Sequence, residues 1–245
     1  IGMVVPHAGF IYSGAIATHA YSVLAENGFA DTFIILGPNH SGQGSGVSIM
    51  TDGAWKTPLG EVKINSNIAK KLYKGIIDKD VSAHMFEHSI EVQLPFLQFI
   101  AKDKDLDFVP ICMMMQDFDT SIEIGDILAD VINQEDKSIV IVASSDFSHA
   151  GFNYMSMPPP GMKVEEYAKK QDKNAIANIL NMDPENLINR VHQDNITMCG
   201  YGPISSMLVA AKKLRASKVE LLKYGTSCEV IQSSSCVGYG ALVVY

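Results

Sequence analysis

The sequence has few cysteines, few basic residues and no long apolar run, and each shortage excludes a class of protein. Its 245 residues include four cysteines, none of them in a C-x-x-C pair, so a disulfide framework is not expected. Lys and Arg number 19 against 27 Asp and Glu, the net charge is −8, and no basic run exceeds two residues. Because nucleic-acid binding needs a basic face, we expect no nucleic-acid partner.

Membrane and export signals are also missing from the sequence. No apolar run approaches the roughly 18 to 20 residues that a transmembrane helix requires, and no segment has the pattern of a signal peptide. Together with reduced cysteines, this predicts a cytoplasmic protein with no membrane partner. The first residue is Ile and lies directly in a strand pattern, so we expect an N-terminal segment upstream of this sequence.

Strand and helix patterns alternate along the chain. This alternation predicts an α/β fold, a three-layer α/β/α sandwich around a mixed, largely parallel sheet. Short apolar runs predict buried strands at residues 2–5, 32–36, 47–50, 107–111, 138–143, 219–224 and 238–244. The last of these is expected to be antiparallel. The patterns on both sides of the Pro-rich loop at 157–161 are alike, so we expect a single domain over residues 1–245.

Helical periodicity predicts helices at residues 14–27, 66–74, 84–100, 120–132, 164–180 and 203–214. Another is expected to begin at Asp183 and Pro184, because Asp is a favoured N-cap and Pro a favoured first residue. Pro95 is expected to kink the helix at 84–100. The turn around Trp55 is interpreted as a hairpin cap, and the Met113–Met115 run as flexible core filler.

Histidines follow three of the predicted strands. His7 ends VVPH, His40 ends ILGPNH, and Asp146 and His149 lie in SSDFSH. Because the carboxyl ends of parallel strands meet at one sheet edge, we expect these side chains to converge there, with Glu87 and His88 of EHS nearby. A solvated loop histidine is the alternative for any one of them. Three on one edge favour a metal site, whereas His19 and His192 are expected to be structural or exposed.

Cys199 lies in TMCGYGPIS, between one predicted helix and the start of the next. The flanking Gly200 and Gly202 allow close backbone packing, and a helix N-terminus would favour the thiolate. A small buried hydrophobic residue is the alternative, which also suits Cys112. The residues alone leave both interpretations of Cys199 open. At the first strand, Pro6 is expected to fix the backbone before His7, and Gly9 to leave room beside the imidazole.

Six short motifs follow one another in a family-specific order: PHAGFIYSG, LGPNH, EHSIEVQLPFLQ, SSDFSH, CGYGPI and VGYGALVV. In this the chain resembles the Memo-like family, the Memo component of the AmmeMemoRadiSam set, from Pro6 to Tyr245. The resemblance implies a fold related to the class III extradiol dioxygenases, which are non-haem iron enzymes. It also implies radical-SAM and AMMECR-type partner proteins.

The resemblance further implies which residues form the site. The metal ligands would be His7, His40 and Cys199, and the expected cofactor is a divalent metal, iron(II) first, with copper or zinc as alternatives. Catalytic roles are expected for His149, Asp146 and His88, and pocket-lining positions for Glu87, Tyr12 and Asn39. Some family members have a second histidine after the one in the GP motif, and Ser41 stands there instead.

Three functions are compatible with these residues. The first is a metal-dependent redox enzyme resembling the dioxygenases, in which His149 carries a proton, since an unperturbed histidine has a pKa of about 6.5. The second is a non-catalytic module that binds a peptide or a partner protein in the same cleft. The third is a zinc-dependent hydrolase. A small-molecule or peptide ligand is expected, and exposed sheet edges could pair in a homodimer.

Overall fold

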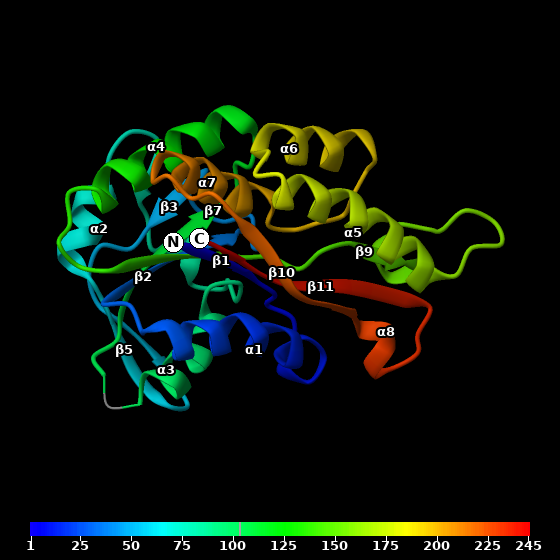
Figure 1. The fold of residues 1–245 in the computed structure, drawn as a ribbon, viewed down its shortest axis with the longest axis horizontal. Coiled ribbons are helices and arrows are strands. Elements are labelled where there is room, and N and C mark those ends of the chain that lie inside the picture. The colour runs from blue at the N-terminus through cyan, green and yellow to red at the C-terminus, as the bar shows by residue number, and fades with distance from the viewer. Residues whose placement is uncertain (103) are drawn as a thin grey trace.

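One mixed sheet runs through the middle of the molecule (Figure 1), in a computed structural model that describes residues 1–102 and 104–245. Its strands follow the order β10 (Val219–Thr226), β11 (Ser235–Val244), β1 (Gly2–Val5), β8 (Ile139–Ser144), β2 (Thr32–Pro38), β7 (Asp107–Met113), β3 (Val47–Ile49) and β6 (Asp78–Lys79). Off this path, β5 (Gly60–Ile64) pairs with β7 and with β4 (Ala54–Thr57), and β9 (His149–Gly151) pairs with β11.

The centre of the sheet is parallel. Strand β8 lies between β1 and β2, and β7 lies beside β2, all in parallel register. Strand β11 runs antiparallel between β1 and β10, which confirms the predicted antiparallel C-terminal strand. Every residue of β1 and β2 is buried, as expected of strands covered on both faces. The predicted α/β class and mixed sheet are therefore confirmed.

Helices cover both faces of the sheet (Figure 1). Below it in this view lie α1 (Phe10–Asn27), α3 (Leu94–Ala101) and α8 (Ser227–Val230). Above it lie α4 (Phe118–Ile132), α5 (Val164–Leu180), α6 (Pro184–Gln193) and α7 (Tyr201–Lys213), while α2 (Ser66–Leu72) lies at one end. Three short 3-10 turns occur at Ser82–His84, Glu91–Gln93 and Phe152–Tyr154.

Local sequence signals explain two of these elements. Asp183 caps α6 by accepting a hydrogen bond from Asn186 N at 3.1 Å, with Pro184 in the first turn, as predicted. Helix α4 packs closely against α7 because Gly125 has no side chain. A Cβ at that position would lie 2.5 Å from the side chain of Val209. This contact holds α7, and the loop before it, in place over the sheet.

The helix predicted at residues 84–100 is confirmed only in its second half. Helix α3 begins only at Leu94, and Pro95 lies in its first turn, where the missing N–H does not interrupt the helix. The preceding residues form a loop because the Glu87 carboxylate accepts hydrogen bonds from the backbone N–H groups of His88 and Ser89. These local bonds replace those of a helix.

Two smaller predictions have mixed outcomes. Trp55 lies in β4 of the β4–β5 hairpin, which confirms the hairpin. Met113 is buried in the core, but Met114 and Met115 are 38% and 47% exposed, so the methionine run is core filler only at its first residue. Among the described residues, no helix combines the length and apolar character needed to cross a membrane.

Candidate metal centre

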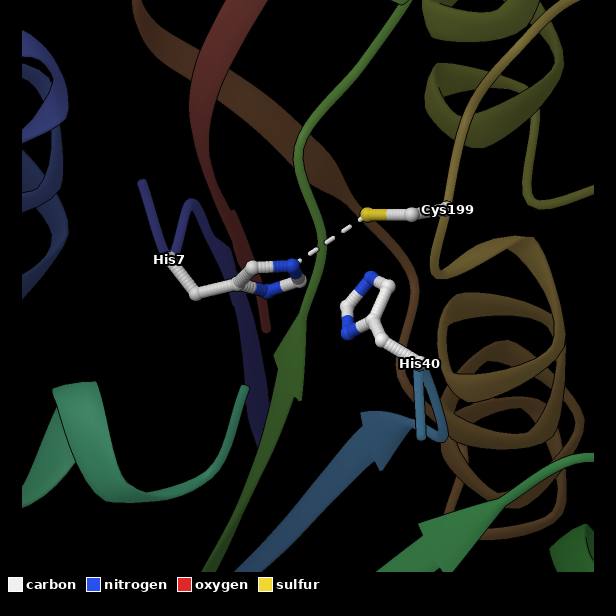
Figure 2. Close-up of side chains that lie close together, drawn as sticks. All are labelled: His7, His40 and Cys199. Carbon is white, nitrogen blue, oxygen red and sulfur yellow. Dashed lines mark hydrogen bonds between the residues drawn. The ribbon is translucent and has the colours of Figure 1, made fainter. Parts of the chain in front are cut away.

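The carboxyl ends of the parallel strands bring the predicted residues together. His7, His40 and Asp146 each lie two residues beyond the end of a strand, after β1, β2 and β8 respectively. Cys199 reaches the same place from the loop between α6 and α7. Figure 2 shows the two imidazoles and the sulfur turned toward one another from these three separate segments.

The three side chains are close enough to share one ion. Their ligand atoms lie within 4.8 Å of one another, and Cys199 Sγ is 3.3 Å from His7 Nε2. Ligand distances of about 2.0–2.1 Å to nitrogen and 2.3 Å to sulfur would place a tetrahedral N and S pair roughly 3.6 Å apart. The spacing of His7, His40 and Cys199 therefore fits a divalent cation.

A buried hydrogen-bond network fixes the tautomer of His7. Ser144 has one hydroxyl proton, which it donates to Ser89 O at 2.6 Å, and its oxygen accepts from Gln93 Nε2 at 2.8 Å. The hydroxyl can therefore only accept at His7 Nδ1, 2.9 Å away. The proton of His7 lies on Nδ1, and the Nε2 lone pair faces Cys199.

The same network continues inward from Gln93. Its amide nitrogen also donates to Pro6 O at 2.9 Å, and its oxygen accepts from Tyr21 Oη at 2.7 Å. Both Gln93 and Tyr21 are buried. Each polar group of this chain has a partner, so the network defines one orientation for the amide and, through Ser144, for the His7 ring.

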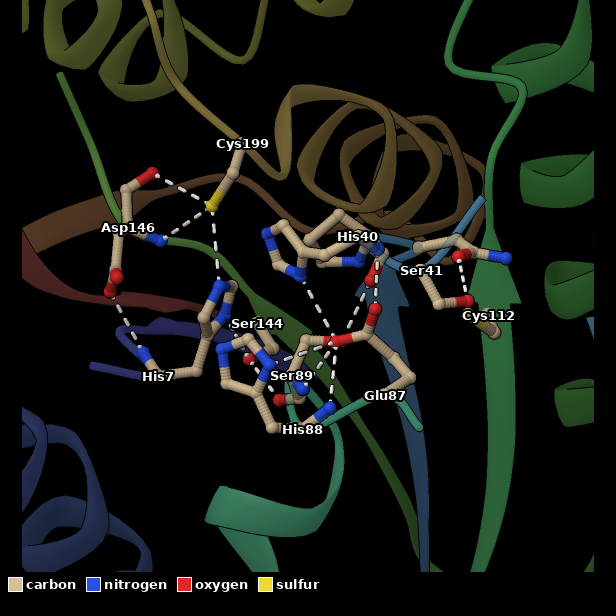
Figure 3. Close-up of polar contacts among 12 residues, drawn as sticks. His7, His40, Ser41, Glu87, His88, Ser89, Cys112, Ser144, Asp146 and Cys199 are labelled. Atoms are coloured by element: carbon tan, nitrogen blue, oxygen red, sulfur yellow. Dashed lines mark hydrogen bonds and ion pairs between the residues drawn. The ribbon is translucent and has the colours of Figure 1, made fainter. Parts of the chain in front are cut away.

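Glu87 orients His40 in the corresponding way. Its carboxylate accepts from His40 Nδ1 at 3.0 Å and from His40 N (Figure 3). A carboxylate accepts here, so Nδ1 carries the proton and Nε2 is left free for a metal. Burial by itself would raise the pKa of Glu87, but hydrogen bonds from His40 and Ser89 hold this pKa well below its usual range. Both histidines thus present a free Nε2, which strengthens the fit to a cation.

Protonation differs between the ligands. Burial lowers the pKa of His7 to about 4, against a smaller opposing effect of Asp146, so its imidazole is neutral at pH 7 as a metal ligand must be. Burial, together with the nearby Asp146 charge, raises the pKa of the Cys199 thiol far above its usual range. Of the two interpretations left open, a thiolate favoured by the helix N-terminus does not describe the metal-free protein, in which Cys199 is a thiol. A metal ion would displace this proton on binding, because the thiolate is the ligand.

The backbone next to Cys199 packs closely against Ser144 and Gln116 because Gly200 and Gly202 have no side chains, as predicted. A Cβ on Gly200 would lie 2.5 Å from Ser144 O, and one on Gly202 would lie 2.7 Å from Gln116 Cβ. The prediction for Gly9 is wrong. Its nearest neighbour would be the Tyr12 ring at 3.8 Å, and Gly9 caps α1 instead of packing beside His7.

His88 lies at the edge of the triad. Its ring centroid is 5.5 Å from that of His7 and 5.0 Å from that of His40, and its side chain is 55% exposed. His40, Glu87 and His88 form a second group with ligand atoms within 4.8 Å. In that group Glu87 Oε1 already accepts from the N–H groups of His88 and Ser89 as well as from His40, so it serves as an acceptor of hydrogen bonds.

Asp146 and His149 lie on the other side of the triad. Asp146 Oδ1 accepts from the backbone N–H of His7 at 2.9 Å and of Ala8 at 3.3 Å, which anchors the end of β1. His149 Nδ1 is 2.9 Å from Thr197 O. A carbonyl only accepts, so Nδ1 is protonated there and His149 Nε2 is a free acceptor.

A cavity of about 330 Å³ adjoins the triad at these residues. Its walls include Tyr12, Asp146, His149, Tyr154 and Tyr239. The structure therefore places Tyr12 in the lining of this cavity. Asn39 does not line it: its amide donates to Gln43 O at 2.7 Å and accepts from Ser41 Oγ and Gly42 N, so Asn39 shapes its own turn.

Sequence reasoning missed the supporting residues Ser89, Gln93 and Ser144. Only Gln93 gave a signal, since it is a polar residue in the apolar stretch that leads to Leu94. Because Gln93 is buried, its side-chain amide must form hydrogen bonds with polar groups inside the protein.

Known proteins resemble this chain along nearly its whole length. The family model described as Memo-like protein matches residues 1–243. This chain belongs to the Memo-like family. A MEMO1 family protein of Methanopyrus kandleri is 45% identical over 245 residues, covering 99% of this chain and 82% of that protein. A MEMO1 family protein of Methanosarcina mazei is 44% identical, covering 100% of this chain and 85% of that protein.

A solved structure shares the fold at low sequence identity. The crystal structure of an uncharacterized protein from Escherichia coli K12 aligns with this Memo-like chain with a TM-score of 0.66 and 14% identity. The alignment covers 99% of this chain and 98% of the other. This likeness supports the α/β architecture and carries no statement about activity.

Proposed function

We propose that this Memo-like protein is a metal-dependent oxidoreductase that acts on a small organic molecule, with oxygen as the oxidant. Its cofactor would be a divalent ion, iron(II) first, held by His7, His40 and Cys199. The observation that carries the proposal is the convergence of two free Nε2 atoms and one thiol at the sheet edge. When bound, such an ion supplies redox chemistry and open coordination positions.

The donor set supports a likeness to the class III extradiol dioxygenases that the family resemblance implies. Non-haem iron oxygenases hold iron(II) with two histidines and one carboxylate on one face. Here Cys199 stands in the carboxylate's place, and the softer thiolate would give more charge to the ion. The Asp146 carboxylate is near, but it accepts hydrogen bonds from the backbone N–H groups of His7 and Ala8.

His149 is the residue best placed to move a proton. Its Nε2 is free to accept, its Nδ1 is held by Thr197, and it lines the cavity beside the triad. We propose that it accepts a proton from a hydroxyl or amine of a ligand bound there. None of the described lining residues of this cavity is Lys or Arg, so no side chain there would balance the charge of an anionic ligand.

The test is the metal content of protein purified without oxygen or chelator, measured by mass spectrometry. We expect close to one iron per chain, with the iron lost in His7→Ala and in Cys199→Ser. His19→Ala is the matched control, because His19 is an exposed histidine far along α1, and it should keep the iron. Unchanged iron in both site variants would refute the proposal.

A zinc-dependent hydrolase is the second candidate, favoured by the same observation. Zinc binds both histidine and cysteine, and its catalytic sites hold three protein ligands and one open position. Zinc in the purified protein, and ester or amide hydrolysis that disappears in His7→Ala, would favour it. Iron together with oxygen uptake in the presence of a phenolic or amine substrate panel would favour the oxidoreductase. A bound metal with neither activity would favour the binding module.

A further inference from the structure

The cavity of about 330 Å³ beside the metal centre has buried and exposed lining residues. Asp146 and Tyr239 are the buried ones that matter here, at 4% and 2% exposed, whereas Tyr12 and Tyr154 are 36% and 41% exposed. The cavity adjoins the metal centre through Asp146, whose backbone N–H donates to Cys199 Sγ at 3.3 Å. A cavity of about 150 Å³ is known to hold benzene, so this one has room for a benzene ring with a short chain attached.

Asp146 is a buried carboxylate with one free oxygen. Its Oδ1 accepts from the backbone N–H groups of His7 and Ala8. Its Oδ2 accepts no hydrogen bond from any described residue, yet it is not sealed from solvent. Within residues 1–102 and 104–245, no Lys, Arg or His side chain forms an ion pair with Asp146. A carboxylate is rarely buried without a positive partner, so Oδ2 is available to a positive group from outside this chain.

The imidazole of this cavity is also a hydrogen-bond acceptor. His149 donates from Nδ1 to Thr197 O at 2.9 Å, so its Nε2 carries no proton. Thr197 does not line the cavity, whereas His149 does. A ligand that meets Asp146 Oδ2 or His149 Nε2 must therefore bring the hydrogen-bond donor itself.

Three tyrosine rings line the same cavity. The ring of Tyr154 meets the His149 imidazole edge to face, with centroids 5.0 Å apart. Burial, together with the Asp146 charge, raises the pKa of Tyr154 and of Tyr239, so the carboxylate lies near both hydroxyl groups, which stay protonated at pH 7. Aromatic faces attract a cation, and rings around a positive charge are a recurring means of recognising organic ammonium groups.

Charge disfavours the other kinds of ligand. An anion would meet the Asp146 carboxylate, and none of the described lining residues is Lys or Arg. A neutral ligand would leave that carboxylate without a positive partner. A metal ion at the triad is another possible partner, but Asp146 does not belong to the group of His7, His40 and Cys199 whose ligand atoms lie within 4.8 Å of one another.

We propose that the substrate of the metal centre is an organic ammonium compound, an amine that carries an aryl or other apolar group. Its ammonium would bind Asp146 Oδ2, with tyrosine rings around the charge and its apolar group toward Val237 and Ile231 of the lining. In naming a substrate class, this rests on the function proposed for the metal centre. Binding to the cavity is nevertheless measured without a metal.

Three probes of similar shape and different charge test the proposal. At pH 7, 2-phenylethylamine is a cation, 2-phenylethanol is neutral and 3-phenylpropanoate is an anion. Their binding to the metal-free protein would be measured by isothermal titration calorimetry. We expect the amine to bind at least about tenfold more tightly than the alcohol, and the propanoate not to bind. Equal affinities for amine and alcohol, tighter binding of the propanoate, or no saturable binding of any probe would overturn the proposal.

Variants assign the preference to the carboxylate. Asp146→Asn keeps an oxygen for the N–H groups of His7 and Ala8 but removes the charge, and should bring the affinities for amine and alcohol within about twofold. Asp119→Asn changes the net charge equally at an exposed site on α4, so this matched control should keep the preference. Tyr154→Leu changes only an exposed ring and should weaken amine binding about two- to fivefold, more than alcohol binding. An unchanged preference in Asp146→Asn would refute the assignment.

Zinc-loaded protein separates this proposal from the function proposed for the metal centre. The preference for the amine should persist with zinc bound. Its disappearance would show that the Asp146 charge balances the metal ion, and the substrate class would be wrong. If the amine binds as expected but the protein takes up no metal, the proposed function fails while the ammonium site stands. If the protein binds metal but not the amine, only the substrate class fails.

Discussion

His7 and His84 are alike in burial but differ in every hydrogen bond. They are 2% and 6% exposed, and burial lowers the pKa of each to about 4. His7 has its Nδ1 proton held by Ser144 and its Nε2 aimed at Cys199, whereas neither nitrogen of His84 has a hydrogen-bond partner within residues 1–102 and 104–245. Burial and a lowered pKa therefore do not identify a metal ligand. The two histidines differ in the partner on the second ring nitrogen, which at His7 fixes which nitrogen is free for a metal.

The largest expected difference between the two histidines is in metal affinity. His7→Ala removes one of three ligands and should weaken cobalt(II) or zinc(II) binding at least a thousandfold, about 4 kcal/mol. His84→Ala should leave the affinity within a few-fold of the wild type, because His84 contacts none of the ligands. Isothermal titration calorimetry on both variants measures this. Similar losses in the two would remove the distinction between the histidines.

Asp172 extends the comparison to a buried carboxyl that does have partners. It accepts from Ser148 N at 2.8 Å and from Tyr224 Oη at 2.6 Å, yet burial raises its pKa from 3.8 to about 6. The folded state then binds the proton more tightly than the unfolded state. The stability that this gives is complete below pH 3.8 and is lost as the pH rises through 6.

Asp172→Asn should remove that part of the pH dependence. Between about pH 4 and 7 the wild type should lose about 3 kcal/mol of unfolding free energy relative to the variant, since one pKa unit corresponds to about 1.4 kcal/mol. Urea unfolding at a series of pH values measures the difference. Parallel curves for the two proteins would show that Asp172 does not titrate in this range.

Loss of Ser144, the hydrogen-bond partner of His7, should lower the metal affinity less than loss of His7 itself. Ser144→Ala removes the acceptor that holds the Nδ1 proton, so the ring can adopt the other tautomer, and metal affinity should fall about 10- to 100-fold. Ser145→Ala is the comparison for the tautomer, because Ser145 Oγ accepts from Gly200 N beside Cys199 and makes no bond with His7, so its loss should leave the His7 tautomer unchanged. Nitrogen-15 NMR of the metal-free protein should show His7 protonated at Nδ1 in the wild type and mixed in Ser144→Ala. A protonated Nε2 in the wild type would contradict the assigned network.

The smallest expected effect is a gain in stability at the unpartnered histidine. His84→Phe replaces a buried polar ring that has no hydrogen-bond partner among the described residues by an apolar ring of similar shape, which should stabilise the protein by about 1 kcal/mol. Thermal unfolding of His84→Phe and His19→Phe compares a buried with an exposed replacement. A clear loss of stability in His84→Phe alone would indicate that the imidazole has a partner in the protein.

The sequence was enough to predict the main strands and the sheet edge where His7, His40 and Asp146 meet, because strand ends are local signals. Cys199 was assigned to the same site only through the family resemblance, because its own residues left two interpretations open. It did not predict the loop between His84 and Leu94, whose conformation depends on Glu87 bonds to the distant His40. Nor did it reveal the tautomers, since Ser144 and Gln93 meet His7 only after the sheet has formed. The unpaired state of His84 is likewise a property of the packed structure.

The most direct test of the metal centre is anomalous X-ray scattering from crystals grown without chelator, in the presence of iron(II) or cobalt(II). The account predicts one peak per chain, bonded to Nε2 of His7, Nε2 of His40 and Sγ of Cys199. No peak at that point, or a metal bound through Nδ1 of either histidine, would contradict it.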